Sequence, residues 1–123
     1  MANEDQIRLQ HMLDAARKTI LFTQNRSKED LNTDDMLTLS VIKLLEIVGE
    51  AAKFVSQSLK DSHPEIAWKQ IAATRDRLVH GYFDVDYDIV WEIVTKDLPS
   101  LIVALEKVIP PNSTEENITG QNP

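Results

Sequence analysis

The sequence contains no cysteine and only three glycines among its 123 residues. The lack of cysteine excludes a disulfide scaffold, a cysteine nucleophile and a cysteine zinc site, and it suits a reducing cytoplasm. The glycines, Gly49, Gly81 and Gly120, lie too far apart to form a phosphate-binding loop or a dinucleotide fingerprint. A P-loop nucleotide hydrolase is therefore excluded.

Long apolar runs are also missing, because the longest purely apolar stretch covers residues 101–105. A bilayer-spanning helix needs about 20 apolar residues, and the first residues, Met-Ala-Asn-Glu-Asp-Gln, lack the basic and apolar regions of an export signal. We therefore expect a cytoplasmic protein with no membrane segment. A chain of this length can form one hydrophobic core but not two. We therefore expect a single helical domain over residues 1–109, followed by a flexible tail over residues 110–123, where the sequence is rich in polar residues.

The charge is acidic overall but unevenly distributed. A net charge of −7 argues against a broad RNA-binding surface. Residues 53–80 nevertheless carry five Lys or Arg against three acids, whereas residues 81–97 carry five acids against one lysine. Any RNA held near residues 53–80 would need additional basic groups from a second subunit, or a few well-placed side chains.

Apolar residues recur at helical spacing along most of the chain, and no strand pattern competes with them. We expect helices over about residues 4–25, 33–59, 64–80 and 87–108, with caps at Ser27, at Asn32 or Thr33, and at Asp86. Pro99 predicts a kink in the last helix, and Gly49 is expected to allow close helix approach. The expected fold is all-α, an antiparallel four-helix bundle in which one short extra helix is allowed.

The third of these helices carries an arginine where the spacing predicts a buried face. At about 100° per residue, Ile71, Leu78 and Tyr82 fall within roughly 60° of Arg75. A guanidinium among apolar neighbours is costly unless it is paired. Either Glu46 or Glu50 satisfies Arg75, or Arg75 lines a cleft that receives an anion.

His80 lies five residues after Arg75, close to a helix end marked by Gly81. Histidine is the side chain whose ordinary pKa suits proton transfer near neutral pH. His80 also has a structural explanation, because a cation at a helix C-terminus complements the dipole. By default, Asp76 would be a solvated acid and Tyr82 a buried ring with its hydroxyl at the rim.

Several segments in order resemble one protein family. Arg75, His80 and Tyr82 match its Arg-x4-His-x-Tyr signature, and three further segments resemble it: His11-Met-Leu-Asp-Ala, Leu45-Glu-Ile-Val-Gly-Glu-Ala-Ala, and Val90-Trp-Glu-Ile-Val ahead of Asp97-Leu-Pro. The sequence resembles the HepT toxins, a branch of the HEPN ribonuclease superfamily, over nearly its whole length to Ile109. A lone Arg-x4-His would be weak, but this context makes the match more specific.

The resemblance implies a metal-independent endoribonuclease that uses no cofactor. In such an enzyme the 2′-hydroxyl of RNA attacks the adjacent phosphate, His80 acts as general base or acid, and Arg75 stabilises the extra negative charge. Asp76 would orient one of these side chains. The resemblance also implies a homodimer, in which two copies of the motif face a shared cleft and supply two histidines.

Tyr82 matches a motif tyrosine that has a regulatory role in the family that the sequence resembles. HepT toxins of type VII toxin–antitoxin systems are paired with MntA, a nucleotidyltransferase antitoxin that is thought to transfer AMP onto the motif tyrosine, and the two can form a larger assembly. Adenylylation of Tyr82 would block the cleft and repel a phosphate substrate.

Two other functions agree with the sequence. The acidic surface also suits a non-catalytic helical adaptor that binds a nucleotidyltransferase, and the origin of the HEPN name suggests a nucleotide-binding regulator. The three histidines are far apart and have no companion ligands, so a metal site is not favoured.

Overall fold

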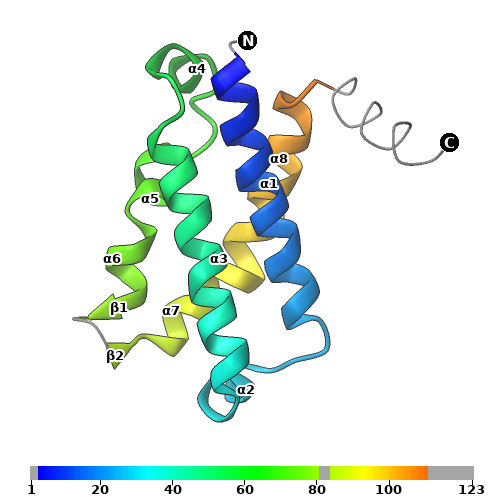
Figure 1. The fold of residues 1–123 in the computed structure, drawn as a ribbon, viewed down its shortest axis with the longest axis vertical. Helices are drawn as coiled ribbons and strands as arrows, with labels where there is room; N and C mark the ends of the chain where they lie inside the picture. The colour runs from blue at the N-terminus through cyan, green and yellow to red at the C-terminus, as the bar shows by residue number, and fades with distance from the viewer. Residues whose placement is uncertain (1–2, 81–83, 111–123) are drawn as a thin grey trace, which may run out of the picture.

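The computed structural model describes residues 3–80 and 84–110, which form a bundle of helices. Figure 1 shows α1 and α3 side by side, with α5 and α6 along one flank of α3. The elements are α1 (Asn3–Thr23), α2 (Lys28–Thr33), α3 (Asp35–Lys53), α4 (Gln57–Ser62), α5 (Trp68–Ala72), α6 (Thr74–Leu78), β1 (Val79–His80), β2 (Asp84–Val85), α7 (Tyr87–Glu92), the π-helix η1 (Ile93–Asp97) and α8 (Leu98–Val108). The predicted all-α fold is confirmed.

The core lies where α1, α3 and α8 meet. Leu9 and Met12 of α1, Val41 of α3 and Leu105 of α8 are fully buried. The apolar residues that recur at helical spacing in the second expected helix are all buried: Leu37, Val41, Leu44, Val48 and Ala51 of α3, followed by Val55. The apolar spacing therefore predicted correctly which side of α3 faces the other helices.

Short side chains cap the helix N-termini as the sequence suggested, with one shift in position. Asp86 accepts a hydrogen bond from the backbone N–H of Ile89 at 3.1 Å, which confirms it as the cap of α7. The cap of α3 is Asp34, which accepts from Leu37 N–H at 3.1 Å. The cap expected at Asn32 or Thr33 was therefore placed one or two residues too early.

The predicted helix over residues 33–59 is wrong at its end, because α3 stops at Lys53 and α4 begins at Gln57. Ser56 caps α4 by accepting from the N–H of Leu59 at 3.3 Å. The buried carboxylate of Asp5 accepts from the backbone N–H of Ser56 at 2.8 Å and from its hydroxyl at 2.6 Å. A contact 51 positions apart in sequence ends this helix, and local periodicity cannot reveal it.

The predicted helix over residues 64–80 is also wrong in detail. It is broken at Ala73 between α5 and α6, and the chain is extended from Val79 onward. Val79 pairs with Val85 and His80 with Asp84 in an antiparallel hairpin, and the N–H of Asp86 donates to the carbonyl of Leu78 at 2.8 Å. The expectation of no strands is therefore wrong here, because two-residue strands are too short to show alternation.

The last helix continues through Pro99, as expected, but a π-helical turn takes the place of a simple kink. The N–H of Leu98 donates to the carbonyl of Ile93, five residues back. Proline has no N–H, and its ring clashes with the carbonyl four residues earlier in an α-helix. The wider turn over Ile93–Asp97 accommodates Pro99.

Gly49 permits a close approach between α3 and α5, as predicted. A Cβ atom at Gly49 would lie 2.9 Å from the carbonyl oxygen of Ile71. Among the described residues, no helix is long and apolar enough to cross a membrane. The tail predicted over residues 110–123 lies outside the described residues except for Pro110.

Candidate active site

Arg75 lies on the outside of α6, so the prediction that it occupies a buried face is wrong. Its side chain is 78% exposed. The buried residues of α6 are Thr74 and Leu78. Thr74 takes an inward position because its hydroxyl donates to the carbonyl of Ile71 at 2.6 Å. A threonine that hydrogen-bonds to its own backbone does not appear in a pattern of apolar residues, so that pattern put the buried side of this helix one residue too late.

One of the two carboxylates expected for Arg75 is its partner. Nε of Arg75 lies 3.3 Å from Oε2 of Glu46, which projects from α3. Surface pairs of this kind contribute about 0–1 kcal/mol to stability. The pair therefore orients Arg75 without holding the bundle together, and the guanidinium stays open to solvent.

His80 lies in β1 and not at the end of a helix, so the alternative in which its charge complements a helix dipole is wrong. Its side chain is 64% exposed, and Nε2 lies 3.7 Å from Oδ2 of Asp86. Asp86 thus caps α7 with one oxygen and faces His80 with the other. The cap could be predicted from the sequence, but this second contact could not, because it depends on the pairing of β1 with β2.

The exposed side chains of Arg75 and His80 lie close together in the chain, at the junction of α6 and β1. Three helical steps and two extended steps separate them, which is roughly 11 Å along the chain. Asp76 is exposed on the same turn as Arg75. Tyr82 lies outside the described residues. Two exposed basic side chains at this separation can both reach one phosphodiester group.

Comparison with known proteins places the chain in a family. The family model described as "Ribonuclease HepT-like" matches residues 12–108. The chain belongs to this HepT-like family. No solved structure matches the chain.

Named relatives of this HepT-like chain occur in bacteria and archaea. "Putative RNase TTE0752" of Caldanaerobacter subterraneus subsp. tengcongensis is 36% identical over 101 residues, which is 82% of this chain and 90% of that protein. "Probable ribonuclease HepT" of Thermococcus cleftensis is 42% identical over 87 residues, 71% of this chain and 79% of that protein. "Putative RNase MJ1380" of Methanocaldococcus jannaschii is 32% identical over 100 residues, 81% of this chain and 92% of that protein.

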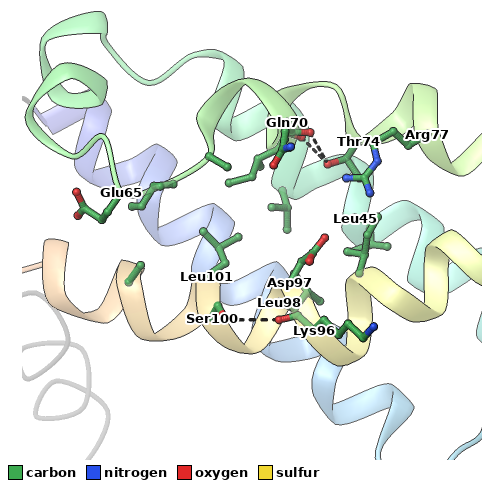
Figure 2. A pocket seen from close by; sticks show the side chains of 16 residues that line it. Leu45, Glu65, Gln70, Thr74, Arg77, Lys96, Asp97, Leu98, Ser100 and Leu101 are labelled. Carbon is green, nitrogen blue, oxygen red and sulfur yellow. Dashed lines mark hydrogen bonds between the residues drawn. The ribbon is translucent and has the colours of Figure 1, made fainter.

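The HepT-like chain also has a cavity of about 250 Å³ that does not include Arg75 or His80. Figure 2 shows it between α5–α6 on one side and η1–α8 on the other. Leu45, Ile71, Leu98 and Leu101 give it an apolar floor. Within residues 3–80 and 84–110, no three His, Asp or Glu side chains group together as metal ligands.

Proposed function

We propose that this HepT-like protein is an endoribonuclease toxin in which Arg75 and His80 cleave RNA without a metal ion. The observation that carries the proposal is the joint exposure of both side chains at the α6–β1 junction, each beside one carboxylate. Family membership supports the choice of RNA as the substrate. We place the reaction in the cytoplasm.

The proposed reaction balances with side chains alone. His80 takes the proton from the 2′-hydroxyl, whose oxygen forms a bond to the adjacent phosphorus while the bond to the 5′-oxygen breaks. The leaving 5′-oxygen receives its proton from a second, protonated histidine, His80 of the other copy in a homodimer, which yields a cyclic phosphate and a free 5′-hydroxyl. Arg75 donates hydrogen bonds to the phosphate oxygens as their charge increases, and Asp76 helps to orient these groups.

Asp86 acts in this proposal as a positioning residue. Its Oδ2 faces Nε2 of His80 at 3.7 Å. A carboxylate beside one ring nitrogen favours a single ring orientation and stabilises the imidazolium that forms when His80 takes a proton. The other ring nitrogen can then face the RNA.

A homodimer would complete the site, because one histidine cannot easily remove and deliver protons on opposite sides of phosphorus. The outer face of α3 (Met36, Leu39 and Glu46) supports this arrangement. Met36 is 82% and Leu39 67% exposed, and both lie within about 80° of Glu46 around the helix. A second copy on this face would bring two Arg75–Glu46 pairs together.

Leu39→Lys tests the dimer by placing a charge on the outer face of α3. Light scattering is expected to give the mass of two chains for the wild type and of one chain for Leu39→Lys, with loss of RNA cleavage. The control is Val103→Lys, at an exposed apolar position of α8, which should remain dimeric. A wild-type protein with the mass of one chain while it cleaves RNA would contradict the dimer.

Tyr82 is the proposed site of inhibition by an MntA-like nucleotidyltransferase antitoxin. An adenylate two residues from His80 adds bulk and negative charge beside a phosphate-binding site. Coexpression with the antitoxin should increase the intact mass by whole adenylate units and stop cleavage. The Tyr82→Phe variant should keep its mass and its activity, and an added adenylate on Tyr82→Phe would contradict the assignment.

The ends of the RNA products test the reaction itself. Purified protein incubated with RNA in EDTA should produce fragments with cyclic phosphate and 5′-hydroxyl ends. Fragments with 5′-phosphate ends, or cleavage only after a divalent metal is added, would contradict the proposed mechanism.

A further inference from the structure

We propose that the cavity between α5–α6 and η1–α8 binds one unstacked guanine base of the RNA. The choice of RNA as the ligand rests on the proposed function, whereas the choice of guanine rests on the cavity itself. The cavity would give the enzyme a base preference through residues that do not belong to the Arg-x4-His motif.

The size and floor of the cavity suit a single base. Ligand pockets for drug-sized molecules measure about 300–1,000 Å³, and this cavity measures about 250 Å³. Its floor consists of aliphatic side chains from α3, α5 and α8: Leu45, Val48, Ile71, Leu98 and Leu101. Such a floor can pack against the flat face of a base.

Four charged residues line this space, Glu65, Arg77, Lys96 and Asp97, and two of them, Arg77 and Asp97, point into it from opposite walls. Figure 2 shows the guanidinium of Arg77 pointing in from α6 and the carboxylate of Asp97 pointing in from the end of η1. Arg77 is partly buried and Asp97 is exposed, and neither side chain has a hydrogen bond or ion pair with any residue that the structure describes. A charged donor and a charged acceptor that face the same cavity without pairing are available to a ligand placed between them.

Guanine is the base that satisfies both groups. Its Watson–Crick edge presents two adjacent donors, N1–H and the N2 amino group, which suit a carboxylate that only accepts hydrogen bonds. Its O6 and N7 are two adjacent acceptors, the pair that arginine contacts most often in specific recognition. Adenine has no N1–H, and uracil and cytosine each offer one donor group on that edge, so each leaves part of the carboxylate unused.

The position of the cavity relative to Arg75 indicates which nucleotide it would hold. Arg75 and Arg77 are about 200° apart around α6, so they project to opposite sides of this short helix. RNA contacting both would pass over α6. The guanine would therefore belong to a nucleotide near the cleaved bond, and its capture would select the cleavage position.

Binding of short RNA to the His80→Ala protein tests this proposal without cleavage. The probes are oligouridines that contain one guanosine, adenosine, inosine or 7-deazaguanosine, measured by fluorescence anisotropy. We expect guanosine to bind at least roughly tenfold more tightly than adenosine, as for other bidentate base contacts. Inosine lacks the N2 amino group and 7-deazaguanosine lacks N7, so both should bind less tightly than guanosine.

Each analogue reports on one wall of the cavity. The loss of affinity on replacing guanosine by inosine should disappear in Asp97→Asn, because this variant lacks the carboxylate that contacts the N2 amino group. The loss of affinity with 7-deazaguanosine should likewise disappear in Arg77→Met, which lacks the guanidinium that contacts N7. Glu92→Gln is the control for Asp97→Asn. It removes the same charge from an exposed position of α7, and it should keep the guanosine preference.

The outcomes separate this inference from the proposed function. Equal affinity for all probes, or a guanosine preference that survives in Asp97→Asn, would overturn the inference even if the wild type cleaves RNA. A guanosine preference that depends on Asp97 would support it even if the wild type cleaves none. Guanosine monophosphate that binds as tightly as the oligonucleotide would assign the cavity to a free nucleotide and overturn the RNA assignment.

Discussion

Oδ2 of Asp86 lies 3.7 Å from Nε2 of His80, while Oδ1 of Asp86 caps α7. The two roles can be separated, because asparagine caps helices as well as aspartate but carries no charge. We predict that Asp86→Asn keeps the melting temperature and the KM for RNA but lowers kcat at least about tenfold, as expected when a proton-transfer group loses its support.

Asp34→Asn is the matched control for that prediction. It makes the same exchange at the cap of α3, where the side chain accepts from Leu37 N–H. Its kcat should equal that of the wild type. Equal kcat values for the Asp86 and Asp34 variants would show that Asp86 acts only as a helix cap.

Glu46 is expected to compete with RNA for Arg75. Its carboxylate lies 3.3 Å from Nε of Arg75, so phosphate must displace it. A surface pair of about 0–1 kcal/mol corresponds to at most roughly a fivefold change in affinity. We predict that Glu46→Gln binds RNA about twofold to fivefold more tightly than Glu50→Gln, which removes the same charge from an exposed position one turn along α3. Equal affinities, measured by anisotropy in the His80→Ala background, would contradict this competition.

Gly49→Ala tests the close contact between α3 and α5. Alanine normally stabilises a helix by roughly 0.5–1 kcal/mol relative to glycine. At Gly49 the new Cβ would lie 2.9 Å from a backbone oxygen of Ile71, and overpacking costs about 1–3 kcal/mol. We predict a net loss of about 1 kcal/mol in the free energy of unfolding, measured by urea denaturation. A more stable variant would show that α5 shifts freely away from α3.

Acid should weaken the junction between α2 and α3. A hydrogen bond from Arg26 is the main cause that lowers the pKa of Asp34 below its ordinary 3.8, and the backbone N–H of Ser27 is the main cause for Asp30. A carboxyl group whose pKa is lower in the folded protein than in the unfolded chain stabilises the fold when the pH is above its ordinary pKa. This stabilisation is lost as the pH falls through the pKa of the folded state. We predict a falling free energy of unfolding below about pH 4, with a smaller fall in Asp34→Asn. The free energy of unfolding is measured by urea denaturation at each pH. An identical fall in the wild type and in Asp34→Asn would contradict this assignment.

Local patterns predicted the helices well where a helix end depends on residues next to it. The buried apolar side of α3 follows from the spacing of its residues, and the cap at Asp86 follows from a short-range hydrogen bond. The end of α3 at Lys53 depends on Asp5, which is far away in sequence. The hairpin at His80 depends on two strands of two residues each, which leave no periodic signal.

The residues of the candidate site come from the sequence, whereas their geometry comes from the structure. The spacing of Arg75 and His80 and the pairing of Arg75 with Glu46 could be proposed from the sequence. The exposure of Arg75 could not, because an inward-facing Thr74 shifts the buried side of α6 by one residue. The Arg77–Asp97 cavity depends on packing between segments about twenty residues apart, so it needed the structure.

The catalytic role of His80 is tested most directly by the rate at which cyclic phosphate ends form from one RNA substrate with the wild type, His80→Ala and His63→Ala. His63 precedes the turn that leads into α5 and lies 3.3 Å from Glu65, so it controls for loss of a histidine outside the motif. We predict cleavage by the wild type and His63→Ala and a fall of at least about a hundredfold in His80→Ala, with melting temperatures unchanged. Equal rates for the wild type and a folded His80→Ala would contradict it.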